Sequence, residues 1–149
     1  MQVFIGGIGC FWDETEYQGV PGIISTECGY CGGNNPTVSY EQVCGGDTEH
    51  IEVVKVKFDP KIISYEGVTR LFFTIHDPTT LNRQGPNVGH QYRSEIFYSN
   101  EEEKISAQKI LDEVNKKLSG KVVTVIRKEK NYCKAEEYHQ KYFEKRSKR

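Results

Sequence analysis

Cys10 stands in the segment Gly9-Cys10-Phe11-Trp12, a context in which a cysteine can act as a nucleophile. An expected strand over residues 2–8 is followed here by an expected short helix over residues 10–19. Backbone N–H groups and the helix dipole at such a junction favour the thiolate, which is the reactive form of the side chain. The two aromatic residues that follow can form an apolar slot for a small uncharged group, such as a methyl on sulfur. The alternative is a buried structural cysteine flanked by core aromatics.

Glu52 is the second residue whose type and position can do chemistry. Residues 51–58, Ile-Glu-Val-Val-Lys-Val-Lys-Phe, alternate in polarity and predict a strand. Glu52 has the parity of Val54, Val56 and Phe58, so its side chain is expected to point to the buried face. Burial disfavours the charged carboxylate and raises its pKa, which makes a proton donor near neutral pH. The alternative is a strand-end carboxylate that is paired with a base or exposed at the sheet edge.

The segment Cys28-Gly29-Tyr30-Cys31 is a C-x-x-C, which is typical of a dithiol redox pair or of half a zinc site. In the strand expected over residues 22–30 and its continuation, Cys28 and Cys31 have opposite parity, which makes a direct disulfide between them awkward. Cys44 and Cys133 are single and distant, and the four histidines lack metal-ligand spacing. We therefore expect no metal site.

Composition narrows the class of protein. The 149 residues suggest one domain over residues 1–149. A formal net charge of −1 gives no reason to expect nucleic acid or an anionic membrane as a partner. No apolar run reaches the roughly 18 residues that a membrane span needs, and the N-terminus lacks the basic region of a secretory signal. Five cysteines without an export signal favour reduced thiols in a reducing compartment, the cytoplasm, over a disulfide framework. We expect a monomer.

The elements that must position these residues alternate between strands and helices. Ser64 is expected to cap a helix that ends at Pro78 and carries apolar residues at helical spacing, namely Val68, Leu71, Phe72 and Ile75. Asn100 and Glu103 resemble a capping box for a helix to about residue 118, with inward residues Ala107, Ile110, Leu111, Val114 and Leu118. Further strands are expected over 94–98 and 121–127, a terminal helix or turn over 135–145, and loops over 31–50 and 77–92. This order predicts an α/β or α+β fold.

Taken together, an ordered set of motifs resembles the A-type peptide methionine sulfoxide reductases. The motifs are Gly9-Cys10-Phe11-Trp12, Gly29-Tyr30-Cys31-Gly32-Gly33, Tyr40-Glu41-Gln42-Val43-Cys44, His50-Ile51-Glu52-Val53-Val54, His76-Asp77-Pro78-Thr79-Thr80, Asn82-Arg83-Gln84-Gly85, Gln91-Tyr92-Arg93-Ser94 and Ala135-Glu136-Glu137-Tyr138-His139-Gln140. They cover nearly the whole chain, and their order makes the resemblance specific. It implies a two-layer α/β sandwich with a ferredoxin-like core and extensive coil.

The resemblance also implies an activity, the reduction of the S epimer of methionine sulfoxide, free or in proteins, without a metal or organic cofactor. Cys10 matches the nucleophile of the family. Tyr40, Glu52 and Tyr92 match the groups that bind and protonate the sulfoxide oxygen. In the implied cycle Cys10 becomes a sulfenic acid, a second thiol converts it to a disulfide, and external thioredoxin reduces that disulfide.

The resemblance also implies positions for substrate binding and leaves two candidates for the second thiol. Phe11 and Trp12 take the methyl-pocket positions, and Asn87 stands where many members carry an aspartate, which keeps a hydrogen-bonding group but loses the charge. The family's common C-terminal extension with recycling cysteines is not expected. The candidates for the resolving thiol are then Cys31 and Cys133, of which Cys133 is favoured because a mobile terminal segment can reach the nucleophile. A cycle with one cysteine stays open.

Two functions of other classes also remain open. A general thiol–disulfide oxidoreductase would use Cys28 and Cys31, reduce protein disulfides and ignore sulfoxides. A non-catalytic module would bind oxidised methionine without releasing methionine. The joint presence of a nucleophile, an acid and two tyrosines argues against the module.

Overall fold

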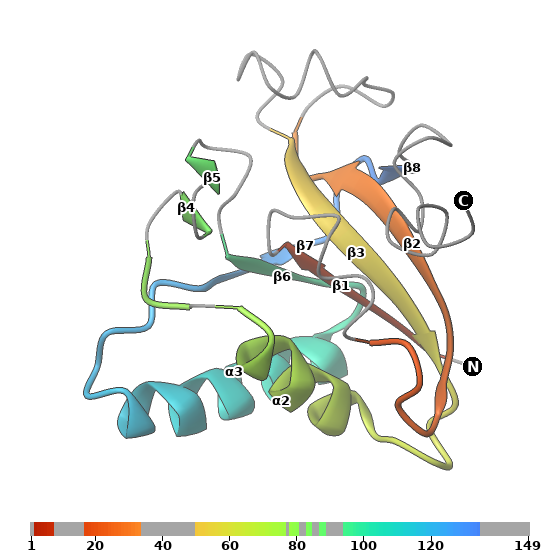
Figure 1. Ribbon diagram of the computed structural model, residues 1–149, viewed down its shortest axis with the longest axis horizontal. Coiled ribbons are helices and arrows are strands. Elements are labelled where there is room, and N and C mark those ends of the chain that lie inside the picture. The colour runs from red at the N-terminus through yellow and green to blue at the C-terminus, as the bar shows by residue number, and fades with distance from the viewer. Residues whose placement is uncertain are drawn as a thin grey trace, which may run out of the picture.

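The computed structural model describes residues 2–7, 17–33, 50–76, 78–80 and 94–134, together with the backbone of residues 83–84 and 87–88. Within these residues a six-stranded sheet carries two helices on one face (Figure 1). Its strands, in spatial order, are β7 (Val125–Lys128), β6 (Glu95–Tyr98), β1 (Gln2–Gly7), β3 (Ile51–Phe58), β2 (Ile23–Cys31) and β8 (Cys133–Lys134). The pair β6–β7 is parallel and the other neighbours are antiparallel. The architecture is therefore α/β, as the sequence predicts.

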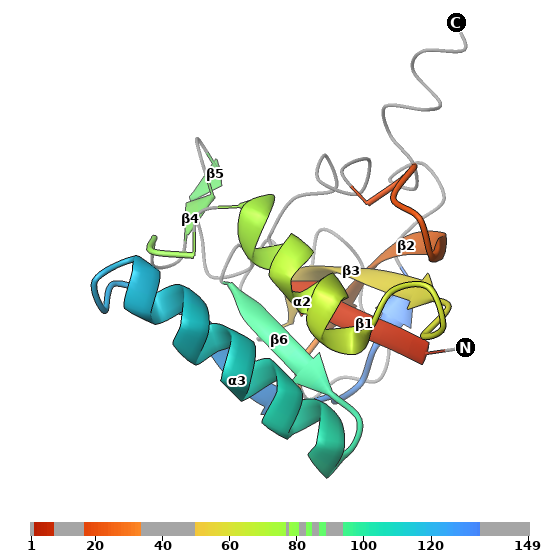
Figure 2. The ribbon, with the colours of Figure 1, turned by 90° about the horizontal axis from the view of Figure 1, so that it is seen from below.

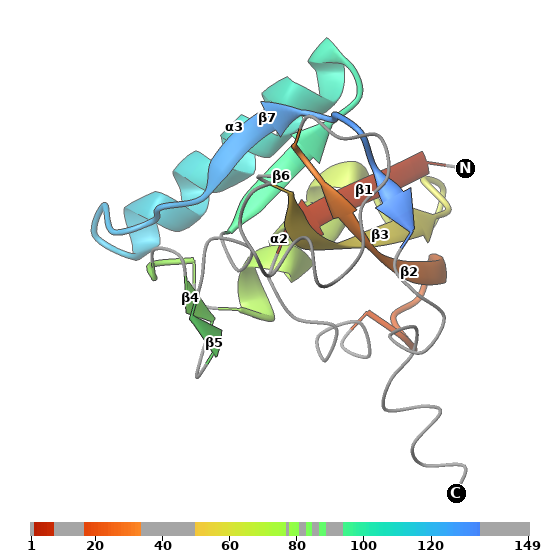
Figure 3. The ribbon, with the colours of Figure 1, turned by 90° about the horizontal axis from the view of Figure 1, so that it is seen from above.

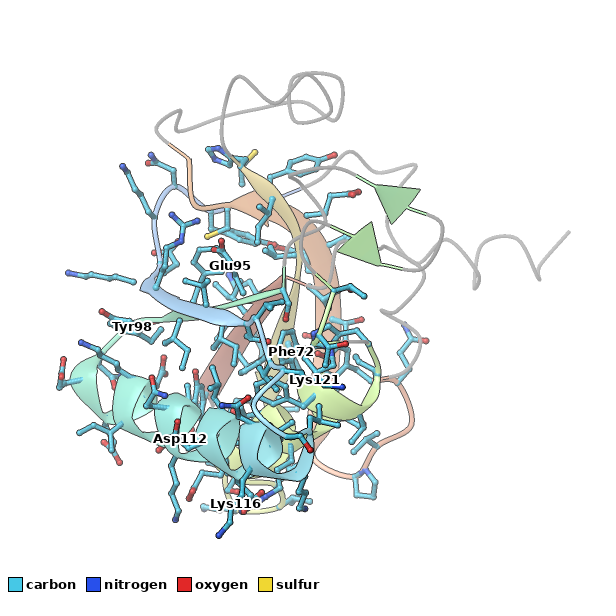
Figure 4. The ribbon with its side chains drawn as sticks, turned by 90° about the vertical axis from the view of Figure 1, so that its left-hand side faces the viewer. Phe72, Glu95, Tyr98, Asp112, Lys116 and Lys121 are labelled. Atoms are coloured by element: carbon cyan, nitrogen blue, oxygen red, sulfur yellow. The ribbon has the colours of Figure 1, made fainter. Side chains whose placement is uncertain are left out.

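The main core lies between this sheet and the helices α2 (Tyr65–Thr74) and α3 (Glu101–Lys117). Both helices lie on the same side of the sheet, as the views from below and above show (Figures 2 and 3). Phe72 lies between α2 and the strands, whereas Lys116 on α3 points away from them (Figure 4). The buried residues of this core include Phe4, Val54, Val56, Phe58, Val68, Phe72, Ile96 and Ile110. Each side chain of this size contributes about 1.5–3 kcal/mol by leaving water.

Both helix starts follow from capping residues that the sequence shows. The Gly67 N–H donates to Ser64 Oγ at 3.0 Å, and the Glu103 N–H donates to Asn100 Oδ1 at 2.9 Å. These bonds satisfy backbone donors that have no partner within the helix. The expected inward position of Leu118 is wrong, because α3 ends at Lys117 and the 37% exposed Leu118 has already left helical geometry.

Other differences from the sequence-based expectations have local causes. Residues 17–19 form a turn instead of the end of a helix. The strand expected over 121–127 begins only at Val125, since the Val122 N–H donates to Asn115 Oδ1 and the Val123 N–H to the Pro78 carbonyl. Within the loop expected over 77–92, β4 (Arg83–Gln84) pairs with β5 (Asn87–Val88). The expected elements over 10–16 and 135–145 lie outside the described residues.

The face of the sheet away from the helices carries a smaller buried cluster of Ile5, Cys31, Ile51, Val53 and Phe97. Here Arg127 Nε pairs with Glu95 Oε2 at 2.8 Å, and the Arg127 guanidinium lies over the Phe97 ring. Gly32, with φ of 103°, lies against this arginine, since a Cβ there would come within 2.5 Å of Arg127 Nη2. Around this cluster the central strands are thus buried on both faces, whereas Lys55 and Lys57 farther along β3 are half-buried and exposed.

In the described part of the chain, no helix combines the length and the apolar character that crossing a membrane requires.

Candidate active site

One end of the sheet collects the strand ends that flank most of the predicted site residues. β1 ends at Gly7, which pairs with Glu95 at the start of β6. β3 starts at Ile51, which pairs with Cys31 at the end of β2. Because β1 and β3 are antiparallel, the end of β1, the start of β6, the start of β3 and the end of β2 all lie at the same end of the sheet. In the sequence, Cys10 follows β1, Tyr40 lies between β2 and β3, and Tyr92 precedes β6. All three residues therefore belong to segments that are connected to this end of the sheet.

Several predicted site residues lie outside the described residues, so their roles stay predictions. They are Cys10, Phe11, Trp12, Tyr40, Tyr92 and the side chain of Asn87. The described residues of the predicted set are Glu52, Cys31 and Cys133, and these carry the geometry that follows.

Glu52 is a buried acid on the helix-facing side of β3, as its parity predicts. Its exposed fraction is 3%, and its Oε2 atom is buried without a hydrogen-bond partner among the described residues. Desolvation raises the pKa of this carboxyl to about 8, because the charged form loses its hydration in the protein interior. Glu52 is therefore neutral over most of the physiological pH range and can donate a proton.

Glu52, Tyr30 and Cys133 form one row across three strands. Tyr30 on β2 pairs with Glu52 on β3 and with Cys133 on β8, and residues directly opposite in antiparallel strands project to the same face. With neighbouring strands about 4.8 Å apart, the Cα atom of Cys133 lies roughly 10 Å from that of Glu52. Cys133 is half-buried, and the fully buried Tyr30 stands between it and the acid. Cys133 thus shares the face of the sheet that carries Glu52.

Cys31 has a different environment from Cys133. It belongs to the buried cluster on the opposite face of the sheet, and its Sγ donates to the Lys130 carbonyl at 3.4 Å. Burial is the main cause that raises the pKa of this thiol to about 12. At neutral pH Cys31 is a protonated thiol, which is a poor nucleophile.

Cys28 pairs with Val54 and so projects to the helix-facing side, whereas Cys31 projects to the other side. The opposite parity expected from the sequence is confirmed. A direct disulfide between the two cysteines would require β2 to be rebuilt. This geometry removes the dithiol pair that a general oxidoreductase would use.

His76 is a residue near the site to which the sequence analysis gave no role. Its Nδ1–H donates to the Phe72 carbonyl at 2.6 Å, and its Nε2 bonds to Ser94 Oγ at 2.7 Å. Ser94 Oγ in turn lies 2.8 Å from Thr124 Oγ1. This network fixes Ser94, which follows the Gln91-Tyr92-Arg93 segment, to the end of α2. The available signal was the position of His76 at the head of the motif His76-Asp77-Pro78-Thr79-Thr80, one of those that carry the family resemblance.

No group of three or more histidine, cysteine or acidic side chains is arranged to hold a metal ion within the described residues.

Comparison with known proteins decides the family. The family model described as peptide methionine sulfoxide reductase matches residues 2–149. The chain belongs to the peptide methionine sulfoxide reductase family. The peptide methionine sulfoxide reductase MsrA of Pelagibacter ubique is 56% identical to this reductase, over 98% of this chain and 100% of that protein.

Solved structures show the same relationship. The reduced form of Mxr1 from Saccharomyces cerevisiae superposes with a TM-score of 0.92 at 40% identity, covering 99% of this chain and 87% of the yeast chain. A structure of Mxr1 in complex with Trx2 matches with a TM-score of 0.66 at 28% identity, covering 88% of this chain and 78% of that chain. The fold of this reductase is therefore that of solved members of the family.

The raised pKa of Glu52 predicts how the stability of this reductase depends on pH. Between pH 4.5 and 8 the unfolded chain releases a proton that the folded chain retains, so the folded state loses stability as pH rises through this window. Glu52→Gln cannot ionise and escapes this loss. Relative to the parent, the variant should gain up to about 1.4 kcal/mol of unfolding free energy per pH unit.

Urea denaturation at pH 4.5, 6.5 and 8 measures this difference. Glu113→Gln is the control, because Glu113 is an acid on the surface of α3 whose pKa is lowered by its hydrogen bond to Arg70. Its difference from the parent should not grow in the same direction. Parallel pH profiles for Glu52→Gln and the parent would contradict a buried neutral carboxyl.

Proposed function

We propose that Cys10 is the nucleophile with which this peptide methionine sulfoxide reductase attacks the sulfur of S-methionine sulfoxide, and that Glu52 is the acid. The observation that carries the proposal is Glu52 itself, a buried carboxyl with an unpartnered oxygen near the start of the central strand β3. The antiparallel neighbour β1 ends at the same end of the sheet, and Cys10 follows β1 in the sequence. A neutral acid is what protonation of a sulfoxide oxygen requires, since the oxygen leaves sulfur only as its charge is neutralised.

The proposed reduction of the sulfoxide consumes one proton and one thiolate. Glu52 gives its proton to the sulfoxide oxygen while the Cys10 thiolate attacks sulfur. The attack forms a bond between Cys10 Sγ and the substrate sulfur. This bond breaks again as the protonated oxygen moves from the substrate sulfur to Cys10 Sγ, which releases the methionine thioether and leaves Cys10 as a sulfenic acid. Phe11 and Trp12 form the slot for the substrate methyl. The remaining substrate contacts are Tyr40 and Tyr92 at the oxygen and Asn87 in the place of the usual aspartate.

For the next step Cys133 is the resolving thiol in this proposal, and Cys31 is not. The Cys133 thiol attacks the Cys10 sulfenic sulfur, an S–S bond forms, and the S–O bond breaks with loss of water. The position of Cys133 on the face of Glu52 supports this assignment. The buried, protonated state of Cys31 on the opposite face argues against the competing one.

An external dithiol then reduces the disulfide, and thioredoxin is the proposed reductant. The solved complex of yeast Mxr1 with Trx2 supports this choice. The proposed setting is the repair of oxidised methionine in proteins under oxidative stress, by a cytoplasmic monomer that needs no metal or organic cofactor. Residues 1–149 form a single catalytic domain in this proposal, a two-layer sandwich with a ferredoxin-like core.

Replacement of the proposed nucleophile tests the function itself. Cys10→Ser should abolish reduction of S-methionine sulfoxide by dithiothreitol, because a serine hydroxyl does not form the corresponding sulfenic acid. Methionine release measured by chromatography reports the result. Cys44→Ser is the matched control and should keep the activity. Turnover that survives in Cys10→Ser would exclude this residue as the nucleophile.

The proton donor predicts a second kinetic signature. The single-turnover rate of methionine release should fall above pH 8 in the parent, because Glu52 loses its proton there. Glu52→Gln should be slower by about 10²–10⁴ and should lack the fall near pH 8. Rapid-quench measurement from pH 6 to 9.5 checks both features. A near-normal rate in the variant would assign the proton to another group.

The resolving thiol is tested by comparing two cysteine variants. Cys133→Ser should stop the cycle at the sulfenic acid, so that one methionine is released per enzyme but thioredoxin no longer supports turnover. Cys31→Ser should keep thioredoxin-driven turnover. Mass spectrometry after one turnover without reductant identifies the product on Cys10. A Cys10 disulfide that forms normally in Cys133→Ser would move the role to another thiol.

A further inference from the structure

Residues 129–132, which immediately precede Cys133, are fastened to the sheet by several hydrogen bonds. The Gly32 N–H donates to the Lys130 carbonyl at 2.8 Å, and Asn131 Nδ2 donates to the Gly33 carbonyl at 2.9 Å. His50 Nε2 lies 3.0 Å from the Asn131 carbonyl. Asn131 adopts φ of 51°, a left-handed conformation that asparagine tolerates better than most residues. This part of the chain is held, which differs from the mobile segment expected from the sequence.

Tyr132 makes the most specific of these attachments. Its hydroxyl donates to Glu27 Oε2 at 2.5 Å, and its ring lies over Gly29, where a Cβ would come within 2.6 Å of Tyr132 Cε2. Lys55, which pairs with Glu27 across β2 and β3, places Nζ 4.8 Å from the centroid of the ring. Burial raises the pKa of Tyr132, so the phenol keeps the proton that it donates.

The alternation of side chains along an extended segment links Tyr132 to its neighbour. The Tyr132 ring lies on the face that carries Gly29 and Glu27, and successive residues of a strand project to opposite faces. Fixing the ring on one face therefore directs the Cys133 side chain to the other face, which carries Glu52. β8 has only two residues in its ladder, and so short an edge strand needs additional restraint to stay paired.

We propose that Tyr132 is a positioning residue for the resolving step of this reductase. Its hydrogen bond to Glu27 keeps β8 on β2 and holds the Cys133 thiol where it can meet the Cys10 sulfenic acid. A held thiol has a high effective concentration, whereas a thiol on a frayed segment samples many positions that do not react. The proposal rests on the assignment of Cys133 as the resolving thiol, and it leaves the reduction of sulfoxide by Cys10 and Glu52 unchanged.

Tyr132→Phe tests the proposal, because it removes the hydroxyl but keeps the ring over Gly29 and under Lys55. In a single turnover without reductant, the variant should release methionine at the parent rate. Its Cys10–Cys133 disulfide should form about tenfold more slowly, the factor expected from loss of one hydrogen bond of ordinary net strength. Dimedone, which traps sulfenic acids, should label Cys10 for correspondingly longer.

Variants of the acceptor separate positioning from general destabilisation. Glu27→Gln keeps an oxygen that accepts the bond and should preserve most of the disulfide rate, whereas Glu27→Ala should match Tyr132→Phe. The double variant Tyr132→Phe/Glu27→Ala should be no slower than either single variant, since both remove the same bond. Tyr98→Phe is the matched control, a tyrosine on β6 that also lies beneath a lysine, Lys104, and should leave both rates unchanged.

Two outcomes would overturn the positioning role of Tyr132. One is a normal disulfide rate in Tyr132→Phe, and the other is an equal slowing of methionine release and disulfide formation. Cys133→Ser, measured alongside, separates this failure from failure of the resolving assignment. If Cys133→Ser stops at the sulfenic acid while Tyr132→Phe behaves as the parent, only the positioning role is lost. If Cys133→Ser still forms a Cys10 disulfide, the assignment of Cys133 itself is wrong.

Discussion

Burial of an acidic side chain within a sheet removes the hydration of its charged form, and this single constraint shapes the chemistry of the reductase. Glu52 lies on a central strand with neighbours on both sides and has only 3% of its surface exposed. Desolvation keeps the carboxyl protonated to about pH 8. The apolar packing around β3 that stabilises the fold thus also keeps this carboxyl neutral.

Cys133 and Cys31 lie on opposite faces of the sheet and have different environments. On the face that packs against the helices, Glu52, Tyr30 and Cys133 stand in one row across β3, β2 and β8. On the other face, Cys31 is a buried thiol that donates to the Lys130 carbonyl. Tyr30 and Cys31 are consecutive in the sequence, yet their side chains point to opposite faces of the sheet. The pleat of β2 therefore decides which thiols can share the environment of the acid.

Residues 129–132 join β7 to β8 and determine how β8 meets the sheet. They are hydrogen-bonded to Gly32 and Gly33, which follow β2, and to His50, which precedes β3. Tyr132 is hydrogen-bonded to Glu27, farther back along β2. The absence of a Cβ at Gly29 leaves the space that the Tyr132 ring occupies. In the proposed arrangement, the contact of Tyr132 with Glu27 on the face that carries Cys31 sets the direction of the Cys133 side chain on the face that carries Glu52.

The sequence by itself determined whatever depends on local periodicity and on ordered motifs. The alternation around Glu52 gave its buried face, and the caps Ser64 and Asn100 gave the starts of both helices, because these signals act within a few residues. The ordered motifs indicated the family. Only the tertiary structure decided that β8 exists and that Cys133, rather than Cys31, shares the face of Glu52. That outcome depends on pairing between residues about a hundred positions apart, Tyr30 with Cys133, and a two-residue edge strand has too little sequence pattern to reveal it.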